Sequence, residues 1–187
     1  MWGLMDYNGC MYALASKLIP LPVLSLQTGA TVATVKGLVL DPATLEVVAF
    51  SCEVGGHAGP ETAILLRDVR ELALDCVIVD SEDELIEIDD IVRLKALRSE
   101  DFALIRKPVV SDMGRKLGNV EDFTINTETN KVQKLYVKQS IVRSFFGASL
   151  IIDRTQIVDV TPKQIVVREA TLKAGVFSPE VVPDIYP

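Results

Sequence analysis

The amino-acid sequence predicts an all-β protein made of two similar small domains. Short apolar segments alternate with turn residues along most of the 187 residues, and sustained 3.6-residue periodicity is scarce, which favours strands over helices. Two stretches, residues 16–50 and 103–137, also share one pattern when Gly29 is aligned with Gly114 at an offset of 85. Such a repeat predicts two copies of one folding unit rather than a single larger domain.

The first copy is expected to contain five strands joined by short turns. Its clearest turn is Asp41-Pro42-Ala43-Thr44, because an Asp side chain accepts hydrogen bonds from the backbone ahead of it and Pro presets φ at the next position. The expected strands lie near residues 22–25, 31–40, 47–53, 63–65 and 76–79.

The second copy repeats this order. Asn126 replaces Asp41 at the start of the corresponding turn, and both turns are expected to close a hairpin. Downstream, residues 155–157 and 165–167 resemble residues 67–69 and 76–79 of the first copy at an offset of 88. The three extra residues predict a longer loop in the second copy, near residues 140–149. At the offset of 85, the apolar positions Val35, Leu38, Leu40 and Val47 fall on Val120, Phe123, Ile125 and Val132.

These patterns divide the chain into two strand-rich domains, residues 15–93 and 105–173. Residues 94–104 have helix-forming composition and predict a short linker helix. Residues 1–14 are expected to be an N-terminal extension, and residues 174–187, with three prolines, a flexible tail. Because units of roughly 80 residues are only marginally stable alone, the two domains are expected to share an interface.

Framework residues of both copies resemble the PRC-barrel domain, a family named for the cytoplasmic part of the photosynthetic reaction-centre H subunit. The family also forms the C-terminal domain of a bacterial ribosome maturation factor. The resemblance implies two small PRC-type β-barrels in tandem, an adaptor or assembly role and no shared catalytic signature. One departure is Ala33, where many members carry the Gly that the second copy keeps at Gly118. The matching segments are PVLS at 22–25, VKGLVLDP at 35–42 and VVAF at 47–50, and then PVVS at 108–111, LGNV at 117–120 and IIDRTQIV at 151–158.

Charge differs strongly between the two halves. Residues 1–93 contain 5 Lys/Arg and 15 Asp/Glu, a net charge of −10, whereas residues 94–187 contain 14 and 11, a net charge of +3. A net acidic chain is poorly suited to neutralise phosphates, so direct nucleic-acid binding is not expected. The asymmetry fits an acidic half that docks on the basic half, or two independently solvated surfaces.

The sequence contains no recognisable catalytic pattern. The single histidine, His57, lies in a Gly-rich loop, and a zinc site needs three or four convergent ligands. The three cysteines, Cys10, Cys52 and Cys76, form no CxxC pair and have no nearby His, which is typical of reduced cytosolic thiols. Cys52 and Cys76 are expected to be buried and inert. We therefore expect no enzyme activity, no cofactor and no metal.

Two segments are candidates for contacts with a partner. Phe145 and Phe146, with Arg143 beside them, place aromatic rings among positive charges, a combination that suits a protein partner or an anionic membrane surface. The alternative is that both rings cap the open end of the second barrel. The acidic run that contains Glu82, Asp83 and Glu84 is interpreted as a solvated face, a docking surface for a basic partner or, last, a metal site.

Together these observations predict a cytoplasmic, non-catalytic module that binds a protein complex, with a homodimer left open. The family resemblance implies two alternatives: an assembly factor of the ribosome-maturation type, or a peripheral component of a photosynthetic or other membrane complex. No transmembrane helix is expected, because the longest uncharged stretch, residues 18–35, is interrupted by Pro20 and Pro22 and spanning takes roughly 20 apolar residues. Peripheral membrane contact remains compatible with the sequence.

Overall fold

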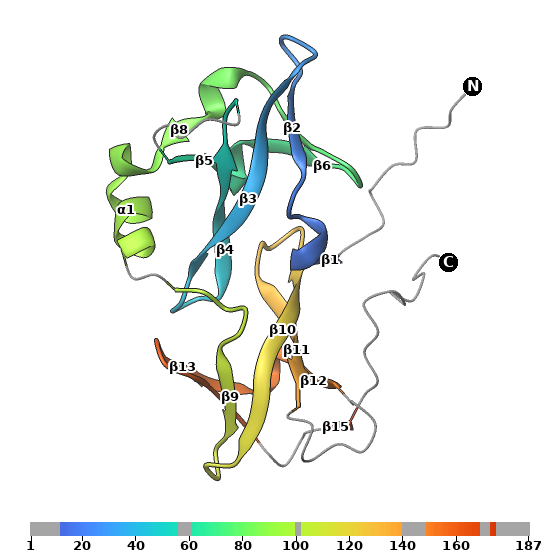
Figure 1. Cartoon of the computed structure of the whole chain (residues 1–187), viewed down its shortest axis with the longest axis vertical. Coiled ribbons are helices and arrows are strands. Elements are labelled where there is room, and N and C mark those ends of the chain that lie inside the picture. Colours follow the sequence, from blue (N-terminus) through green and yellow to red (C-terminus); the bar gives the residue numbers. More distant parts are fainter. Residues whose placement is uncertain (1–11, 56–60, 100–101, 140–148, 169–172, 175–187) are drawn as a thin grey trace, which may run out of the picture.

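The computed structural model confirms an all-β architecture of two curled sheets (Figure 1). It describes residues 12–55, 61–99, 102–139, 149–168 and 173–174. In the view of Figure 1 one sheet lies above the other, and the chain crosses between them at helix α1 (Val92–Ser99). In these ranges no helix has both the length and the apolar character needed to cross a membrane.

The upper sheet, called the first sheet, is built from residues of the first copy. Its strand order is β6-β7-β2-β3-β4-β5-β8. The pairing of β2 with β7 is parallel and the other pairings are antiparallel. The strands are β2 (Pro22–Ser25), β3 (Thr31–Asp41), β4 (Glu46–Glu53), β5 (Thr62–Leu65), β6 (Val69–Leu72), β7 (Val77–Val79) and β8 (Ile86–Glu87).

The lower, second sheet has the order β13-β14-β9-β10-β11-β12-β15, and the short strand β1 (Tyr12–Leu14) also pairs with β10. Strand β1 therefore comes from the N-terminal end of the chain, although all other members of this sheet follow residue 107. The remaining strands are β9 (Pro108–Ser111), β10 (Lys116–Asn126), β11 (Val132–Lys138), β12 (Ser149–Asp153), β13 (Ile157–Val160), β14 (Ile165–Val167) and β15 (Lys173–Ala174).

The two sheets share strand order, register and irregularities. Strand β2 pairs with β3 through Val23 and Ala33, and β9 pairs with β10 through Val109 and Gly118, two pairs that occupy matching positions. The ladder of β3 with β4 has two register shifts, and the ladder of β10 with β11 has shifts at the positions 85 residues later. Each sheet also contains one parallel pair at the same place, β2 with β7 and β9 with β14.

The predicted hairpin turns form as the side chains indicate. Asp41 Oδ1 accepts hydrogen bonds from the backbone N–H of Ala43 and Thr44, at 2.9 and 3.4 Å. Asn126 Oδ1 accepts the equivalent bonds from Glu128 and Thr129, at 3.1 and 2.8 Å. An amide oxygen thus replaces a carboxylate oxygen without changing the turn.

The difference between Ala33 and Gly118 has a steric cause. Gly118 has a φ of +151° beside a register shift, and a Cβ built there would collide with the carbonyl group of Lys138. Ala33, at the matching position, is buried without a positive φ. The first copy therefore accommodates a methyl group where the second copy brings two backbones together.

Helix α1 covers the outer face of the first sheet. Leu94, which is 2% exposed, packs with Val39, Ala49 and Ala63 in a small core of its own. The helix begins two residues before the predicted linker helix and ends at Ser99 instead of residue 104. Leu104, which follows the helix, is 1% exposed and belongs to the main core.

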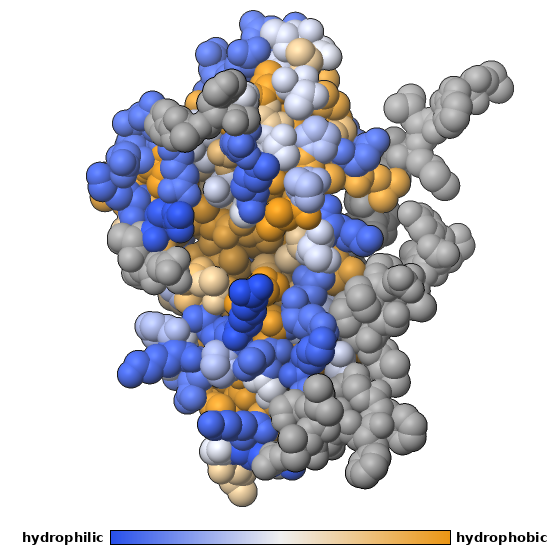
Figure 2. All heavy atoms as spheres, in the orientation of Figure 1, coloured by the Kyte–Doolittle hydropathy of each residue, from blue (hydrophilic) through white to orange (hydrophobic). Residues whose placement is uncertain are grey.

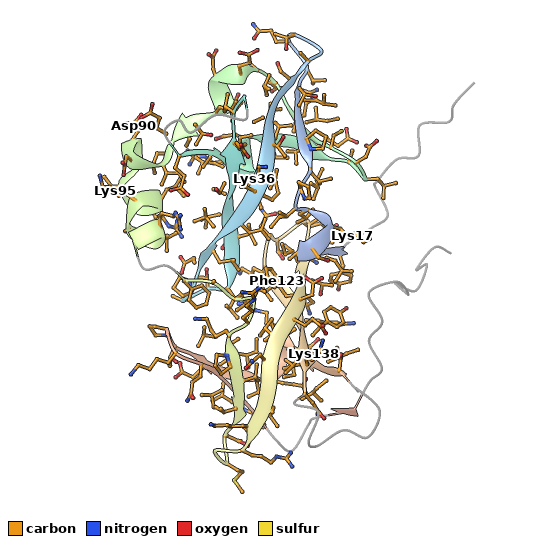
Figure 3. The ribbon with its side chains drawn as sticks, viewed as in Figure 1. Lys17, Lys36, Asp90, Lys95, Phe123 and Lys138 are labelled. Atoms are coloured by element: carbon orange, nitrogen blue, oxygen red, sulfur yellow. The ribbon has the colours of Figure 1, made fainter. Side chains whose placement is uncertain are left out.

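One hydrophobic core runs through both halves. It contains Val35, Phe50 and Val77 from the first half and Phe123 and Leu135 from the second. Figure 3 shows Phe123 in the region where the two sheets meet. The expected interface between the halves is therefore part of the core.

Candidate protein-binding cleft between the two sheets

The two hairpin turns meet through hydrogen bonds between equivalent residues. The Val47 N–H donates to Asn130 O and the Val132 N–H donates to Leu45 O, both at 2.8 Å, and Glu46 forms an antiparallel bridge with Lys131. Val47 and Val132 are 85 residues apart, and so are Leu45 and Asn130, and Glu46 and Lys131. A local two-fold axis therefore relates the two halves at this contact, as in a symmetric dimer interface.

The N-terminal segment fastens the first half to the second. Strand β1 pairs with β10, and Ser16 follows β1 along the chain. Asp122 accepts hydrogen bonds from the Ser16 backbone N–H at 3.2 Å and from Ser16 Oγ at 2.5 Å. Asp122 is 4% exposed, and its Oδ1 also accepts from the Phe123 N–H at 2.7 Å. On the other side, Arg154 donates to the carbonyl oxygens of Thr44, at 2.6 Å, and Val132.

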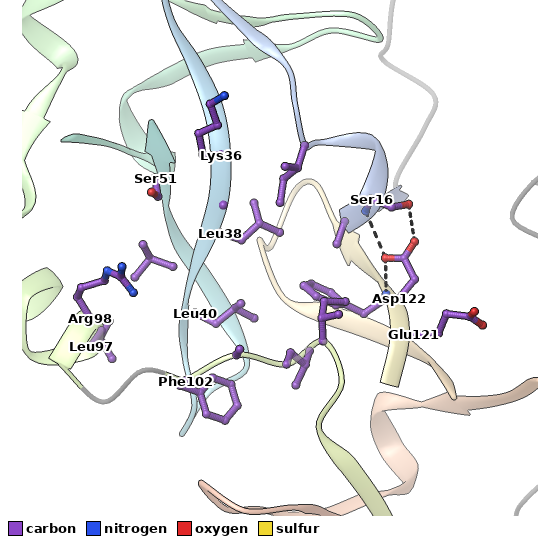
Figure 4. A pocket seen from close by; sticks show the side chains of 18 of the residues that line it. Ser16, Lys36, Leu38, Leu40, Ser51, Leu97, Arg98, Phe102, Glu121 and Asp122 are labelled. Atoms are coloured by element: carbon purple, nitrogen blue, oxygen red, sulfur yellow. Dashed lines mark hydrogen bonds between the residues drawn. The ribbon is translucent and has the colours of Figure 1, made fainter. Parts of the chain in front are cut away.

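A cleft of about 480 Å³ lies beside this junction, and both halves contribute to it (Figure 4). The lower part of β3 forms one wall, and the region around Asp122 and the segment after β1 form the opposite wall. Figure 2 shows apolar surface at the middle of this face, between the more polar surfaces of the two halves. The apolar lining residues include Ile19, Leu38, Leu40, Leu97, Phe102 and Ile105.

Ion pairs surround the apolar lining. Lys36 Nζ lies 2.6 Å from Glu53 Oε2, and Arg98 Nε lies 2.8 Å from Glu61 Oε1. These side chains are 37 to 51% exposed, so each pair contributes only about 0–1 kcal/mol to stability. Their main consequence is a charged rim of both signs around an apolar floor, the arrangement found in many protein-binding surfaces.

A buried lysine fixes the Phe102 wall of the cleft. Lys107 Nζ lies 4.3 Å from the centre of the Phe102 ring and donates to Pro162 O at 2.8 Å. Burial lowers the pKa of this ammonium group. Through Lys107, Phe102 is held next to the second sheet, although in sequence it comes just after helix α1 of the first half.

A second, basic depression lies on the second sheet, outside the cleft. Its volume is about 1380 Å³, and strands β9 and β10 contribute much of its lining. Arg115, Lys116, Lys138 and Lys163 line it, and Lys138 also pairs with Glu121 at 3.3 Å. These are four of the 14 Lys and Arg residues of the second half.

The acidic candidate residues lie apart from the cleft lining. Glu82, Asp83 and Glu84 form a 3-10 turn that Ser81 caps by accepting a hydrogen bond from the Asp83 N–H. Glu82 and Asp83 are exposed, and none of the three lines the cleft. Across the ranges that the structure describes, no group of three or more His, Cys, Asp or Glu side chains could hold a metal ion.

The other sequence candidates divide into two groups. Arg143, Phe145 and Phe146 lie outside the described residues, as does His57. Cys52 and Cys76 are free and buried, as expected, and burial raises the pKa of the Cys52 thiol to about 12.

Sequence reasoning missed the cleft itself. Its walls include residues of β3, of the end of α1 and of the segment 102–105. The sequence assigned β3 to the first domain, α1 to the linker helix, and residues 102–105 to the boundary between that linker and the second domain. The available signal was the pair Phe102 and Leu104, two large apolar residues at the end of a segment otherwise rich in charge.

Comparison with protein families matches residues 99–172 to the PRC-barrel domain. The match covers strands β9 to β14 of the second sheet together with residues 102–105, which line the cleft. No curated protein matches the sequence significantly. Residues 99–172 therefore match a PRC-barrel domain, and the cleft lies where this segment meets the preceding half.

Proposed function

We propose that this protein is a non-catalytic protein-binding or assembly module made of two PRC barrels, and that it holds its partner in the cleft between them. PRC-barrel domains typically take part in protein interaction or assembly. The shared strand order and register of the two sheets support a second barrel in the first half. A cytoplasmic location is part of this proposal, and the free thiols of Cys52 and Cys76 are compatible with it.

The observation that carries this proposal is an apolar cleft built by both halves. Its volume is about 480 Å³, and its lining includes residues 36–40 of the first half and residues 121–123 of the second. Ile105 remains 40% exposed at its edge, and the rim carries charges of both signs. A partner that covers these side chains removes apolar surface from water, which is the main driving force for association.

The test compares a charge placed in the cleft with the same charge placed elsewhere. Ile105→Glu introduces a carboxylate into the apolar lining, and Val158→Glu introduces it on β13, where Val158 is 53% exposed and outside the cleft. Proteins captured by the wild type should be lost with I105E and kept with V158E. Both variants must retain the circular dichroism spectrum and melting temperature of the wild type within a few degrees. Equal capture by all three proteins would refute the cleft as the contact surface.

The basic depression supports a second candidate function, an assembly factor for an RNA-containing complex such as a ribosomal subunit. Its lining by Arg115, Lys116, Lys138 and Lys163 favours phosphate contacts, although the whole chain is acidic. Co-sedimentation with ribosomes that falls steeply with salt, and falls further with Lys116→Glu/Lys163→Glu, is the expected result for this function. Co-sedimentation with membranes instead would favour the peripheral-membrane alternative.

The Phe145–Phe146 segment remains a proposed second contact. Phe145→Ser/Phe146→Ser removes both rings and leaves the cleft residues unchanged. If the bound proteins were the same as for the wild type, this segment would have no role in partner binding, whatever the outcome for the cleft.

A further inference from the structure

Strand β10 has two successive partners along one edge. Strand β9 pairs with Lys116, Gly118 and Asn119, and further along the same strand β1 pairs with Thr124, Ile125 and Asn126. Opposite both of them, β11 covers the other edge. The second sheet thus uses a short segment from elsewhere in the chain to complete an edge that β9 leaves open.

The first sheet has the same edge without the second partner. Strand β2 pairs with Thr31, Ala33 and Thr34 of β3, which match the β9 contacts on β10. Beyond them, residues 37–41 of β3 pair with β4 on one side, and no strand among the described residues pairs with them on the other. Residues 36–40 instead line the cleft.

Hydrogen bonds at the hairpin ends indicate which backbone groups face that side. The Asn126 N–H donates to Lys131 O across its hairpin, so the backbone groups of Ile125 point the opposite way, toward Ala13 of β1. In the first copy Asp41 O accepts from the Leu45 N–H across the matching hairpin. The backbone N–H and C=O of Leu40 are therefore directed toward the open edge.

The reason for the difference lies in the chain that precedes each copy. Strand β1 and a 3-10 turn precede Leu18 in the first copy, whereas helix α1 precedes Leu104, the matching residue of the second copy. A helix satisfies its own backbone groups and cannot extend a sheet. Leu97 of this helix lines the cleft without pairing with β3.

We propose that residues 37–41 of β3 accept an extended segment of a partner protein as an added antiparallel strand, as β10 accepts β1. This inference rests on the proposed function, because it names how a partner occupies the cleft. The expected segment is three or more residues long and carries apolar side chains that pack on Leu38, Leu40 and Phe102. Main-chain hydrogen bonds supply affinity in this mode, and the apolar lining supplies selectivity.

One position distinguishes the two edges. Asp122 of β10 holds the Ser16 N–H and hydroxyl, and the matching residue of β3 is Gly37. A Cβ at Gly37 would meet only Ser51 Cβ, at 3.8 Å, which is an ordinary van der Waals contact, so the backbone there accepts a Cβ without a clash. Gly37→Asp should therefore give the β3 edge the serine-binding carboxylate of the β10 edge.

The probe is a labelled peptide of residues 12–19, the segment that already pairs with β10. Titrated into the full-length protein, it is expected to bind saturably, with amide NMR shifts concentrated at residues 36–41 and 102–105. G37D should tighten binding about tenfold, the effect of one charge-assisted hydrogen bond. A peptide with Ser16→Ala keeps the backbone N–H donor and loses the hydroxyl, so it should gain clearly less from G37D than the unchanged peptide does, and the difference between the two gains measures the hydroxyl contact.

Three results would overturn the proposal. They are an absence of saturable binding to both proteins, shifts at residues 122–126 that report displacement of β1, and shifts along another edge such as β8 or β13. If the peptide fails while I105E still abolishes partner capture, the cleft remains the binding site and strand addition is wrong. If the peptide binds as expected while I105E captures the same proteins as the wild type, the proposed function fails and the β3 edge is still a strand acceptor.

Discussion

Removal of the Asp122 carboxylate should loosen the attachment of the N-terminal segment to the second sheet. The carboxylate is buried and accepts three hydrogen bonds, two of them from Ser16. A hydrogen bond to a charged group contributes about 1.5–3 kcal/mol, and Ser16 is exposed, which places the Ser16 hydroxyl bond near the lower value. We expect Ser16→Ala to cost about 1.5 kcal/mol and Asp122→Ala about 3 kcal/mol.

A double-mutant cycle isolates the contact between these two residues. The variants S16A, D122A and S16A/D122A should give a coupling free energy of about 1–2 kcal/mol in urea unfolding followed by circular dichroism. For a chain of this length, 3 kcal/mol lowers the melting temperature by roughly 6–12 °C. Ser51→Ala is the matched control, because Ser51 lines the same cleft without contacting Asp122. A coupling near zero, or equal losses for S16A and S51A, would refute this account of how the segment is held.

Two further predictions concern the matching positions of the two copies. Burial raises the pKa of Asp41, but hydrogen bonds from Arg93 and from the turn backbone outweigh burial and hold the pKa below 3.8. Asp41→Asn removes the charge and should therefore lower the free energy of unfolding by under about 1 kcal/mol in urea at pH 7. That cost should vanish as the pH falls below 3.8 and the wild-type carboxyl is protonated, and a constant difference down to pH 2 would contradict it. Gly118→Ala should cost about 2–4 kcal/mol through collision with the Lys138 carbonyl, whereas Gly37→Ala should change the unfolding free energy by less than about 1 kcal/mol, and similar losses would contradict the steric argument.

The parts of the fold set by local chemistry were predictable from the sequence. The side chains of Asp41 and Asn126 determine their turns through bonds to residues two and three positions ahead, so the sequence specifies them directly. The alternation of apolar residues likewise located β2, β3 and β4 to within about one residue.

The parts set by contacts between the halves were not predictable. The three residues of β1 match no strand pattern strong enough to specify a partner more than 100 positions away, and the contact of the neighbouring Ser16 with Asp122 spans a similar separation. Helix α1 ends before its predicted limit because Leu104 is buried in the core, and that burial outweighs local helix propensity. The segment after β1 and the residues after α1 both line the cleft, so the cleft exists only where the two halves pack together.

Site-specific photo-crosslinking tests most directly whether the cleft holds the partner. A benzophenone amino acid replaces Ser51 or Ile105 in the cleft, and Met113 or Val158 at exposed control positions outside it. The account predicts one crosslinked partner from both cleft positions, joined through a short extended segment identifiable by mass spectrometry, and none from the controls. Crosslinks from Met113 or Val158 alone, with none from Ser51 or Ile105, would contradict it.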